Sequence, residues 1–202
     1  DPTPPPSYNR GYWMDMDVDG NGRVWLAYQE RDLDPEQGGT WLNIARGDGD
    51  PAVFNHWQVD GRGVVVGGLL TGQFPGGNYA SIEVDANGIA HAAHHDTGRN
   101  DNPGRLMYVE GNEDGWESTE VEAFGVGEWC SIGLAGGEPI IAYYDPGNGD
   151  LRVARRSGDS WQAERVDQGE ILEPGDDDDS AGEPPAAVPG DVGKYADLLV
   201  AS

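Results

Sequence analysis

Four side chains able to bind a metal or carry a proton lie within six residues, at His91, His94, His95 and Asp96. Imidazole and carboxylate groups are ligands for transition metals, and imidazole is also a general acid or base near neutral pH. Side chains alternate along a strand, so His91 and His95 are expected on one face and His94 and Asp96 on the other. A packing role, a zinc-type site and acid–base chemistry all stay open for this stretch.

Acidic side chains also occur at the spacing of a calcium-binding loop, in the run from Asp15 to Gly22. Alternating carboxylates before a glycine supply oxygen ligands and a sharp turn, but an EF-hand needs a carboxylate at the position that Leu26 occupies. The same run also describes a β-hairpin turn. If a metal is bound, we expect calcium, with Asp15, Asp17 and Asp19 as its ligands.

The acidic run belongs to a short pattern that occurs four times: glycine, any residue, an aromatic residue, a small or apolar residue, then Asp or Ser. The copies, called cassettes here, begin at Gly11, Gly77, Gly127 and Gly193. An apolar run with alternating polarity follows each one. A pattern that recurs at intervals of this size is typical of a repeat architecture.

Alternation along a strand places the aromatic and polar side chains of each cassette on one face and the apolar side chains on the other. Aromatic rings beside carboxylates and hydroxyls suit a sugar or a cation, although such residues also serve as spacers between repeats. The candidate ligand-binding residues are therefore Trp13, Asp15, Tyr79, Ser81, Trp129, Ser131, Tyr195 and Asp197.

Each of the first three cassettes opens a set of four expected strands, separated by turns rich in Gly, Asp and Asn. The strands are expected at 14–18, 24–28, 41–45 and 57–59, then at 81–84, 90–95, 106–109 and 116–121, then at 131–134, 140–144, 151–154 and 161–166. Four-stranded meanders in tandem are propeller blades, and each blade is too small to bury its own faces alone. The sequence predicts an all-β protein: a β-propeller segment of three blades plus the first strand of a fourth, an incomplete ring.

The chain divides along these repeats into seven expected segments. They are a proline-rich lead-in at 1–10, blade 1 at 11–62, an inter-blade insertion at 63–76, blade 2 at 77–122, blade 3 at 123–168, an acidic proline-rich loop at 169–192, and the first strand of blade 4 at 193–202. Three blades and one strand do not close a ring, and an open ring leaves sheet edges exposed. We expect the remaining blades to come from the same polypeptide or from another subunit.

The composition excludes several classes of partner. The formal net charge of −25, with Lys194 as the single lysine, disfavours nucleic acid and anionic membranes. No apolar run is long enough to span a membrane, and the single cysteine, Cys130, cannot form an intrachain disulfide. The opening run 1–6 is similar to the stalk behind a cleaved export signal, so an extracellular or periplasmic location is expected.

Several features together resemble one group of known proteins: the inner Ser or Asp strand, the Asn-Gly turns, the second strand at 142–145, and a Trp opening each fourth strand. They resemble secreted bacterial propellers related to the sialidase superfamily. The Asp-box of those blades corresponds here to 113–116 and 157–161, which keep only part of that motif. A looser resemblance is to fucose-binding lectin propellers, in which short chains can assemble into a complete ring.

The resemblance implies a propeller fold, but no catalytic residue is transferred from it. Sialidases use an arginine cluster, a Tyr with its Glu, and an acid Asp, and the arginines of this chain are scattered. We therefore expect an exported, non-catalytic binding or scaffolding module of a larger propeller, with a glycan or protein ligand. The alternatives are a sialidase-like glycoside hydrolase whose site is completed by further blades, or a carbohydrate-binding lectin.

Overall fold

The computed structural model describes residues 8–32, 39–48, 53–60, 64–66, 69–71, 76–97, 103–168 and 192–200. Within these ranges the chain forms three four-stranded antiparallel sheets and one two-stranded sheet, with no helix. This architecture confirms the prediction of an all-β protein with three propeller blades. The described residues contain no helix long and apolar enough to cross a membrane.

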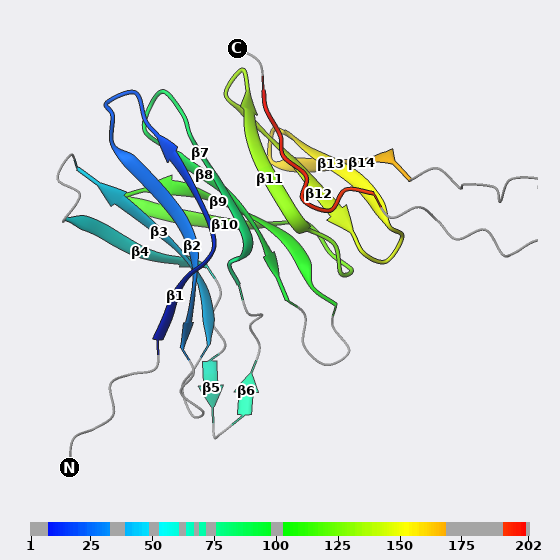
Figure 1. The fold of residues 1–202 in the computed structure, drawn as a ribbon, viewed down its shortest axis with the longest axis horizontal. Helices are drawn as coiled ribbons and strands as arrows, with labels where there is room; N and C mark the ends of the chain where they lie inside the picture. The colour runs from blue at the N-terminus through cyan, green and yellow to red at the C-terminus, as the bar shows by residue number, and fades with distance from the viewer. Residues whose placement is uncertain are drawn as a thin grey trace, which may run out of the picture.

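Each four-stranded sheet is a meander in which neighbours along the chain are neighbours in the sheet (Figure 1). Blade 1 consists of β1 (Tyr8–Val18), β2 (Val24–Asp32), β3 (Thr40–Gly47) and β4 (Phe54–Asp60). Blade 2 consists of β7 (Asn78–Val84), β8 (Ala90–Asp96), β9 (Arg105–Asn112) and β10 (Gly115–Glu122). Blade 3 consists of β11 (Glu128–Ala135), β12 (Glu138–Asp145), β13 (Asp150–Ser157) and β14 (Ser160–Asp167).

The first strands of the three blades, β1, β7 and β11, contact one another in that order, so they are the inner strands. Between blades 1 and 2, β5 (Val64–Val66) and β6 (Leu69–Thr71) pair as a short hairpin inside the predicted insertion. The strand β1 begins at Tyr8, three residues before the first cassette. The predicted acidic loop lies almost entirely outside the described residues.

The predicted first strand of a fourth blade is not formed. Residues 192–200 contain a turn and otherwise irregular backbone, with no strand. A strand needs a ladder partner, and the described residues supply no second strand of a fourth blade to pair with this segment. The segment nevertheless runs along β11, where the Leu198 N–H donates to Ser131 Oγ at 3.0 Å (Figure 1).

Two aspartates, the buried Asp19 and the partly buried Asp85, shape the turns that join the inner strand to the second strand in blades 1 and 2. Asp19 Oδ1 accepts the N–H groups of Asn21 and Arg23 at 2.9 and 3.0 Å. Asp85 Oδ1 does the same for Asn87 and Ile89 at 2.9 and 2.8 Å. Burial alone raises the pKa of each carboxyl, but the hydrogen bonds outweigh it and hold both pKa values below their usual level.

The apolar core lies between blades rather than within them. One cluster joins blades 1 and 2 through Trp25, Ala27, Leu42, Ile44, Ala80, Ile82, Ala90, Ala92 and Val109. A second joins blades 2 and 3 through Ala93, Leu106, Tyr108, Val126, Cys130, Ile132, Ile141, Tyr143 and Ala154. Each blade therefore depends on its neighbour for burial, as stacked repeats do.

Candidate functional site

The four cassettes share the same distorted backbone. Their aromatic residues are all in the left-handed region, with φ of 50° at Trp13, 54° at Tyr79, 53° at Trp129 and 58° at Tyr195. A bulky residue with this φ is uncommon and is strained by about 1–3 kcal/mol. The strand pairing slips at the same point in each inner strand, between Tyr12 and Asp15, Asn78 and Ser81, and Glu128 and Ser131. The simple alternation assumed from the sequence is therefore interrupted between the aromatic and the polar residue of each cassette.

The distortion brings the four aromatic rings together in one cluster, called the aromatic cluster here. Ring centroids lie 4.3 Å apart for Trp13 and Tyr79, 4.5 Å for Tyr79 and Trp129, and 4.0 Å for Trp129 and Tyr195. The rings of Trp13 and Trp129 lie 5.5 Å apart in an edge-to-face arrangement. These residues are 66 and 50 positions apart in sequence, so their meeting is a product of blade stacking.

An open hollow of about 180 Å³ lies at the aromatic cluster, called the aromatic hollow here. Each cassette contributes its aromatic residue and the residue after it: Trp13, Met14, Tyr79, Ala80, Trp129, Cys130, Tyr195 and Ala196. None of these side chains carries a formal charge at neutral pH, and burial raises the pKa of Tyr79, which keeps its hydroxyl protonated. The hollow thus offers ring faces and tyrosine hydroxyls to an uncharged or cationic ligand.

The polar half of the predicted site lies outside the lining of the hollow and connects successive inner strands. Asp15 Oδ2 accepts a hydrogen bond from Ser81 Oγ at 2.9 Å and another from the Ile82 N–H at 3.0 Å. Ser81 Oγ in turn accepts from the Ile132 N–H at 3.2 Å. A side chain in one blade therefore holds the backbone of the next.

The same relation continues to the last cassette. Ser131 Oγ accepts from the Leu198 N–H and lies 3.5 Å from Asp197 Oδ1. Asp17 adds a second rung, because its Oδ2 accepts from the Val84 N–H at 2.8 Å. These bonds form what we call the inner-strand ladder. It fixes the spacing of the cassettes and so positions the aromatic cluster.

The three predicted calcium ligands face different partners. Asp15 and Asp17 belong to the inner-strand ladder, whereas Asp19 caps its own turn and also accepts from Trp25 Nε1 at 3.1 Å. Over the described ranges no three His, Cys, Asp or Glu side chains are grouped so that they could hold a metal ion. Calcium binding stays a prediction.

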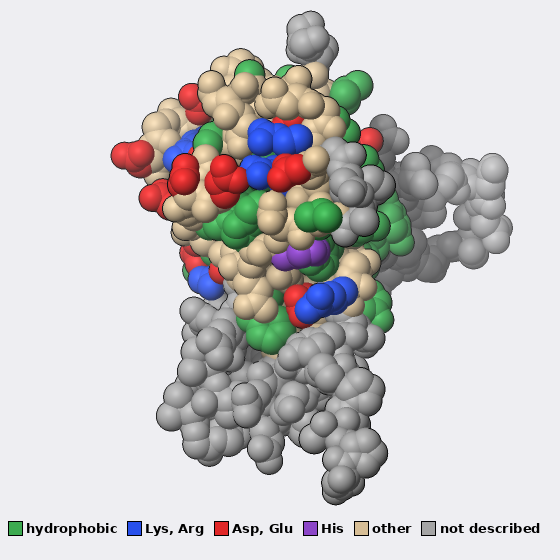
Figure 2. All heavy atoms as spheres, turned by 90° about the vertical axis from the view of Figure 1, so that its left-hand side faces the viewer, with side chains coloured by type: hydrophobic (Ala, Val, Ile, Leu, Met, Phe, Trp, Pro, Cys, Tyr) green, Lys and Arg blue, Asp and Glu red, His purple; other side chains and the backbone are tan. Residues whose placement is uncertain are grey.

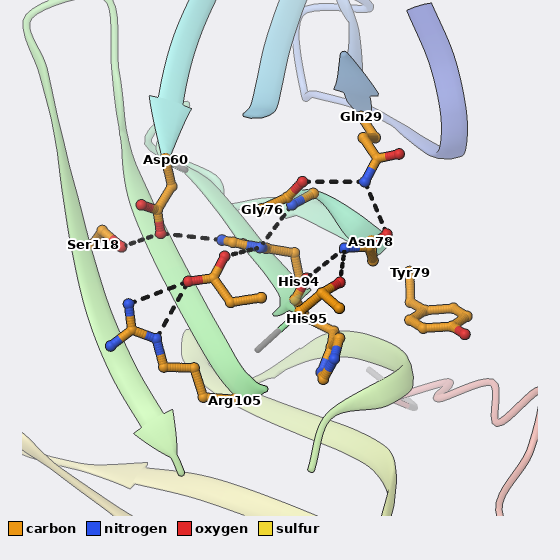
Figure 3. A network of polar contacts seen from close by, with 12 residues as sticks. Gln29, Asp60, Gly76, Asn78, Tyr79, His94, His95, Arg105 and Ser118 are labelled. Atoms are coloured by element: carbon orange, nitrogen blue, oxygen red, sulfur yellow. Dashed lines mark hydrogen bonds and ion pairs between the residues drawn. The ribbon is translucent and has the colours of Figure 1, made fainter. Parts of the chain in front are cut away.

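The histidine stretch lies on β8 and takes part in contacts between blades (Figure 3). His94 Nδ1 accepts the Gly77 N–H at 3.0 Å, which leaves the proton on Nε2, 3.1 Å from Asp60 Oδ2. Ser118 also donates to this oxygen of Asp60. His94 therefore links the end of blade 1, the second cassette and the outer strand of blade 2.

His95, His91 and Asp96 bond different groups. His95 Nδ1 donates to the Val126 carbonyl at 2.9 Å, and burial lowers the pKa of His95 to about 4. His91 Nδ1 lies 2.6 Å from the Tyr108 hydroxyl, and burial lowers its pKa as well. Asp96 is buried against Arg105, with burial raising its pKa. His94 and His95 thus contact groups at the two inter-blade junctions, whereas His91 bonds within blade 2, and Asp96 Oδ1 also lies 3.7 Å from His94 Nδ1.

Sequence reasoning did not single out Asp60, Ser118 or Gln29. Gln29 Nε2 donates to the Gly76 carbonyl at 3.2 Å and to Asn78 Oδ1 at 2.9 Å. These two bonds connect β2 of blade 1 to the beginning of the second cassette. Aligning the repeats could have singled out Asp60, because an acidic residue ends the fourth strand in blade 1 and again, as Glu122, in blade 2. Ser118 carries no such signal, since 58 residues separate it from its partner.

Most arginines of the described part pair with acidic side chains rather than forming a cluster. On the face shown in Figure 2, basic side chains lie directly beside acidic ones. Eight arginines have a carboxylate partner, namely Arg10, Arg23, Arg46, Arg105, Arg152, Arg155, Arg156 and Arg165. None of them lines the aromatic hollow.

No protein-family profile matches the sequence, and no curated protein is significantly similar to it. Among solved structures, a Hadza microbial sialidase is 13% identical, with a TM-score of 0.52 over 77% of this chain and 37% of its own. A protein of the GH130 family of mannoside phosphorylases is 14% identical, with a TM-score of 0.51 over 81% of this chain and 54% of its own. A fucose lectin from Kordia zhangzhouensis is 17% identical, with a TM-score of 0.44 over 75% of this chain and 96% of its own. The similarity to the first two supports a propeller-like fold, of which this chain spans about half or less.

Proposed function

We propose that this protein is a non-catalytic, carbohydrate-binding module of a larger β-propeller, with the aromatic hollow as its binding site. The observation that carries the proposal is the aromatic cluster, in which four residues at the same cassette position adopt the same strained backbone. Strain of this kind persists only where the surrounding structure enforces it, and it is concentrated at functional sites. Export of the module remains a prediction from the lead-in.

The chemistry of the hollow favours a neutral saccharide. Ring faces of Trp and Tyr pack against the apolar face of a sugar, and tyrosine hydroxyls supply hydrogen bonds. Trp13 and Tyr195 are exposed, so their rings are accessible to a ligand. Two structural neighbours with TM-scores above 0.5 are a sialidase and a member of a mannoside phosphorylase family, and both names refer to carbohydrate substrates.

A glycan array followed by tryptophan-fluorescence titration of each hit tests the proposal. Trp129→Ala is expected to weaken binding about 30-fold, the effect of losing a binding hot spot worth about 2 kcal/mol. Phe124→Ala is the matched control, since Phe124 is an exposed aromatic residue with φ of 71° that does not line the hollow. Absence of binding to every glycan, or equal losses in the two variants, contradicts the proposal.

One observation favours glycoside hydrolysis as a second candidate function. Burial raises the pKa of Glu83 on β7, and the nearby carboxylates of Asp17 and Asp15 raise it further. A carboxyl whose pKa is raised by burial and by neighbouring carboxyl groups is the kind of group that glycosidases use as a general acid. Hydrolysis of nitrophenyl glycosides that is lost in Glu83→Gln and retained in the exposed-site control Glu164→Gln supports this candidate. No turnover by the wild-type protein excludes it for those substrates.

A further inference from the structure

Three Asn-Gly pairs occur in the sequence, and each lies in a turn between two strands of a blade. Asn21-Gly22 lies between β1 and β2, Asn87-Gly88 between β7 and β8, and Asn148-Gly149 between β12 and β13. All three asparagines are exposed, and the glycines have φ of 77°, 80° and 74°. Each glycine N–H donates to the carbonyl of the aspartate that begins the turn, at 2.8, 3.0 and 2.8 Å. The three pairs therefore allow a comparison in which the glycine backbone is nearly constant.

The asparagine side chains of the second and third turns are held by a carboxylate. Asn87 Nδ2 donates to Asp85 Oδ2 at 3.0 Å. Asn148 Nδ2 donates to Asp145 Oδ2 at 2.8 Å. In both turns the acceptor is the aspartate that begins the turn, so the amide group is fixed against the turn's own carboxylate.

The asparagine of the first turn lacks this bond. Asp19 Oδ2 instead accepts from Arg23 Nε at 2.7 Å and from Trp25 Nε1 at 3.1 Å. Asn21 bonds Asp19 through its backbone N–H, and its side-chain amide has no hydrogen bond with any residue that the structure describes. Ile89 holds the position of Arg23 in the second turn and has no side-chain donor that competes for the carboxylate.

We propose that Asn21 is a site of spontaneous deamidation, selected because Asp19 does not hold its side-chain amide. The Gly22 nitrogen attacks Cγ of Asn21, and the bond from Cγ to the amide nitrogen breaks. The amide nitrogen leaves as ammonia and takes the proton of the Gly22 N–H, which gives a cyclic succinimide. Water then opens the ring to aspartate or isoaspartate, and either product adds a negative charge beside Asp19. The inference goes beyond the proposed function and does not depend on sugar binding.

The reaction requires the asparagine side chain to turn toward the next backbone nitrogen. Glycine allows this approach because it has no Cβ. At Asn87 and Asn148 the movement breaks a hydrogen bond to a carboxylate, which lowers the population of the reactive orientation by about tenfold. At Asn21 no such bond is lost. The bond from the glycine N–H to the aspartate carbonyl opposes the reaction in all three turns alike.

A further blade ahead of β1 leaves this site accessible. Asn87 holds the same turn position in blade 2, and it is exposed although blade 1 precedes it. The donors that occupy Asp19 belong to blade 1 itself, because Arg23 lies in the same turn and Trp25 on β2. The expected selectivity therefore depends on contacts within this one hairpin.

Peptide mapping by mass spectrometry, during incubation of the folded chain at mildly alkaline pH, tests the proposal. Asn21 is expected to convert about tenfold faster than Asn87 and Asn148. In denaturant the three are expected to convert at similar rates, because each is followed by glycine and the turns are lost. Equal rates in the folded protein, faster conversion of Asn87 or Asn148, or an Asn21 that stays intact while the denatured chain converts completely overturns the proposal.

A variant of the first turn tests why Asn21 is selected. Arg23→Ile introduces the residue of the second turn and removes one of the two donors from Asp19 Oδ2, so that this oxygen can accept the Asn21 amide. Conversion of Asn21 is expected to slow severalfold. Arg155→Ile is the matched control, because it removes an exposed arginine that pairs with Glu164 in blade 3, and it should retain the wild-type rate. Equal rates in the two variants contradict the proposed selection by Asp19, whereas the wild-type comparison does not depend on either variant folding.

Discussion

The junction between blades 1 and 2 and the junction between blades 2 and 3 use the same positions with different chemistry. In the first, Gln29 reaches across to the Gly76 carbonyl. In the second, His95 holds the position of Gln29 and donates to the Val126 carbonyl. The fold therefore requires a hydrogen-bond donor to a backbone carbonyl at this position, but the type of side chain varies. Of the two junctions, only the second uses a side chain that titrates.

The neighbouring position shows the same contrast. His94 bonds Asp60, the carboxylate that closes the outer strand of blade 1, and accepts the Gly77 N–H on its other nitrogen. Its counterpart in blade 3, Tyr143, donates to Glu122, and the equivalent glycine N–H bonds a backbone carbonyl instead. The inner-strand ladder links the inner strands at both junctions. The two junctions therefore share the hydrogen bonds between inner strands but differ in the polar side chains that link their second and outer strands.

The largest loss of stability is expected from replacing the glycine that begins the second or the third cassette, because each lies against the preceding blade. A Cβ added at Gly127 meets Leu106 backbone at 2.8 Å, and one added at Gly77 meets the Trp41 carbonyl oxygen at 2.7 Å. Both residues also have positive φ, so Gly127→Ala and Gly77→Ala each combine backbone strain with overpacking. We expect each to lower the free energy of unfolding by about 4 kcal/mol, measured by urea denaturation.

The first cassette supplies the control for that experiment. Gly11 has φ of 86°, yet an added Cβ meets nothing within 4 Å. Gly11→Ala therefore isolates the backbone strain, which is about 1 kcal/mol. Equal losses for Gly11→Ala and Gly127→Ala show that packing against the preceding blade contributes nothing at these glycines.

The next prediction concerns the pH dependence of stability, to which the second junction contributes through His95. Burial lowers the pKa of His95 to about 4 from its unfolded value near 6.5, so the folded state favours the neutral ring. Its contribution is complete above about pH 6.5 and is lost as the pH falls toward 4, which amounts to about 3 kcal/mol. His91 acts in the same direction, whereas the raised pKa values of Asp96 and Glu83 partly offset both.

Giving the second junction the chemistry of the first tests this assignment. His95→Gln keeps a donor for the Val126 carbonyl, as Gln29 has for Gly76, but it removes the titrating group. Between pH 6.5 and 4.5 the unfolding free energy of the variant is expected to fall by about 2 kcal/mol less than that of the wild-type protein. Gln58→Ala, at an exposed residue of β4 that does not titrate, is the control and should retain the wild-type slope.

The sequence was sufficient for the strands of the three blades and for the presence of the cassettes, because alternation and turn residues are local signals. It wrongly predicted a strand in the fourth cassette. It was not sufficient for the arrangement within a cassette. The left-handed φ of Trp13 and the register shift before Asp15 direct the aromatic and the polar side chain to different places. Neither distortion can be predicted from an alternating pattern of polar and apolar residues. Contacts such as His94 with Asp60 depend on blade stacking and have no local signal.

A smaller effect is expected from the ladder itself. Ser81→Ala removes a hydroxyl that donates to Asp15 and accepts from the Ile132 N–H, which leaves a buried donor without a partner. The expected loss is about 1–2 kcal/mol in the free energy of unfolding. Ser160→Ala, at an exposed serine of the outer strand β14, is the control and should stay within about 0.5 kcal/mol of wild type. A neutral Ser81→Ala shows that the ladder does not stabilise the stack.

The smallest effect tests whether cassette positions are interchangeable. Cys130 occupies the position of Ala80 and Ala196, and its Sγ lies 2.9 Å from the Tyr79 carbonyl oxygen. Cys130→Ala removes one buried sulfur from a site that already takes alanine in the neighbouring cassette, so we expect a loss below about 1 kcal/mol. Burial raises the pKa of the Cys130 thiol, so the folded wild-type protein should also react slowly with a thiol reagent and the unfolded protein quickly. A loss above about 2 kcal/mol means that the third cassette is packed around its sulfur and differs from the second in more than sequence.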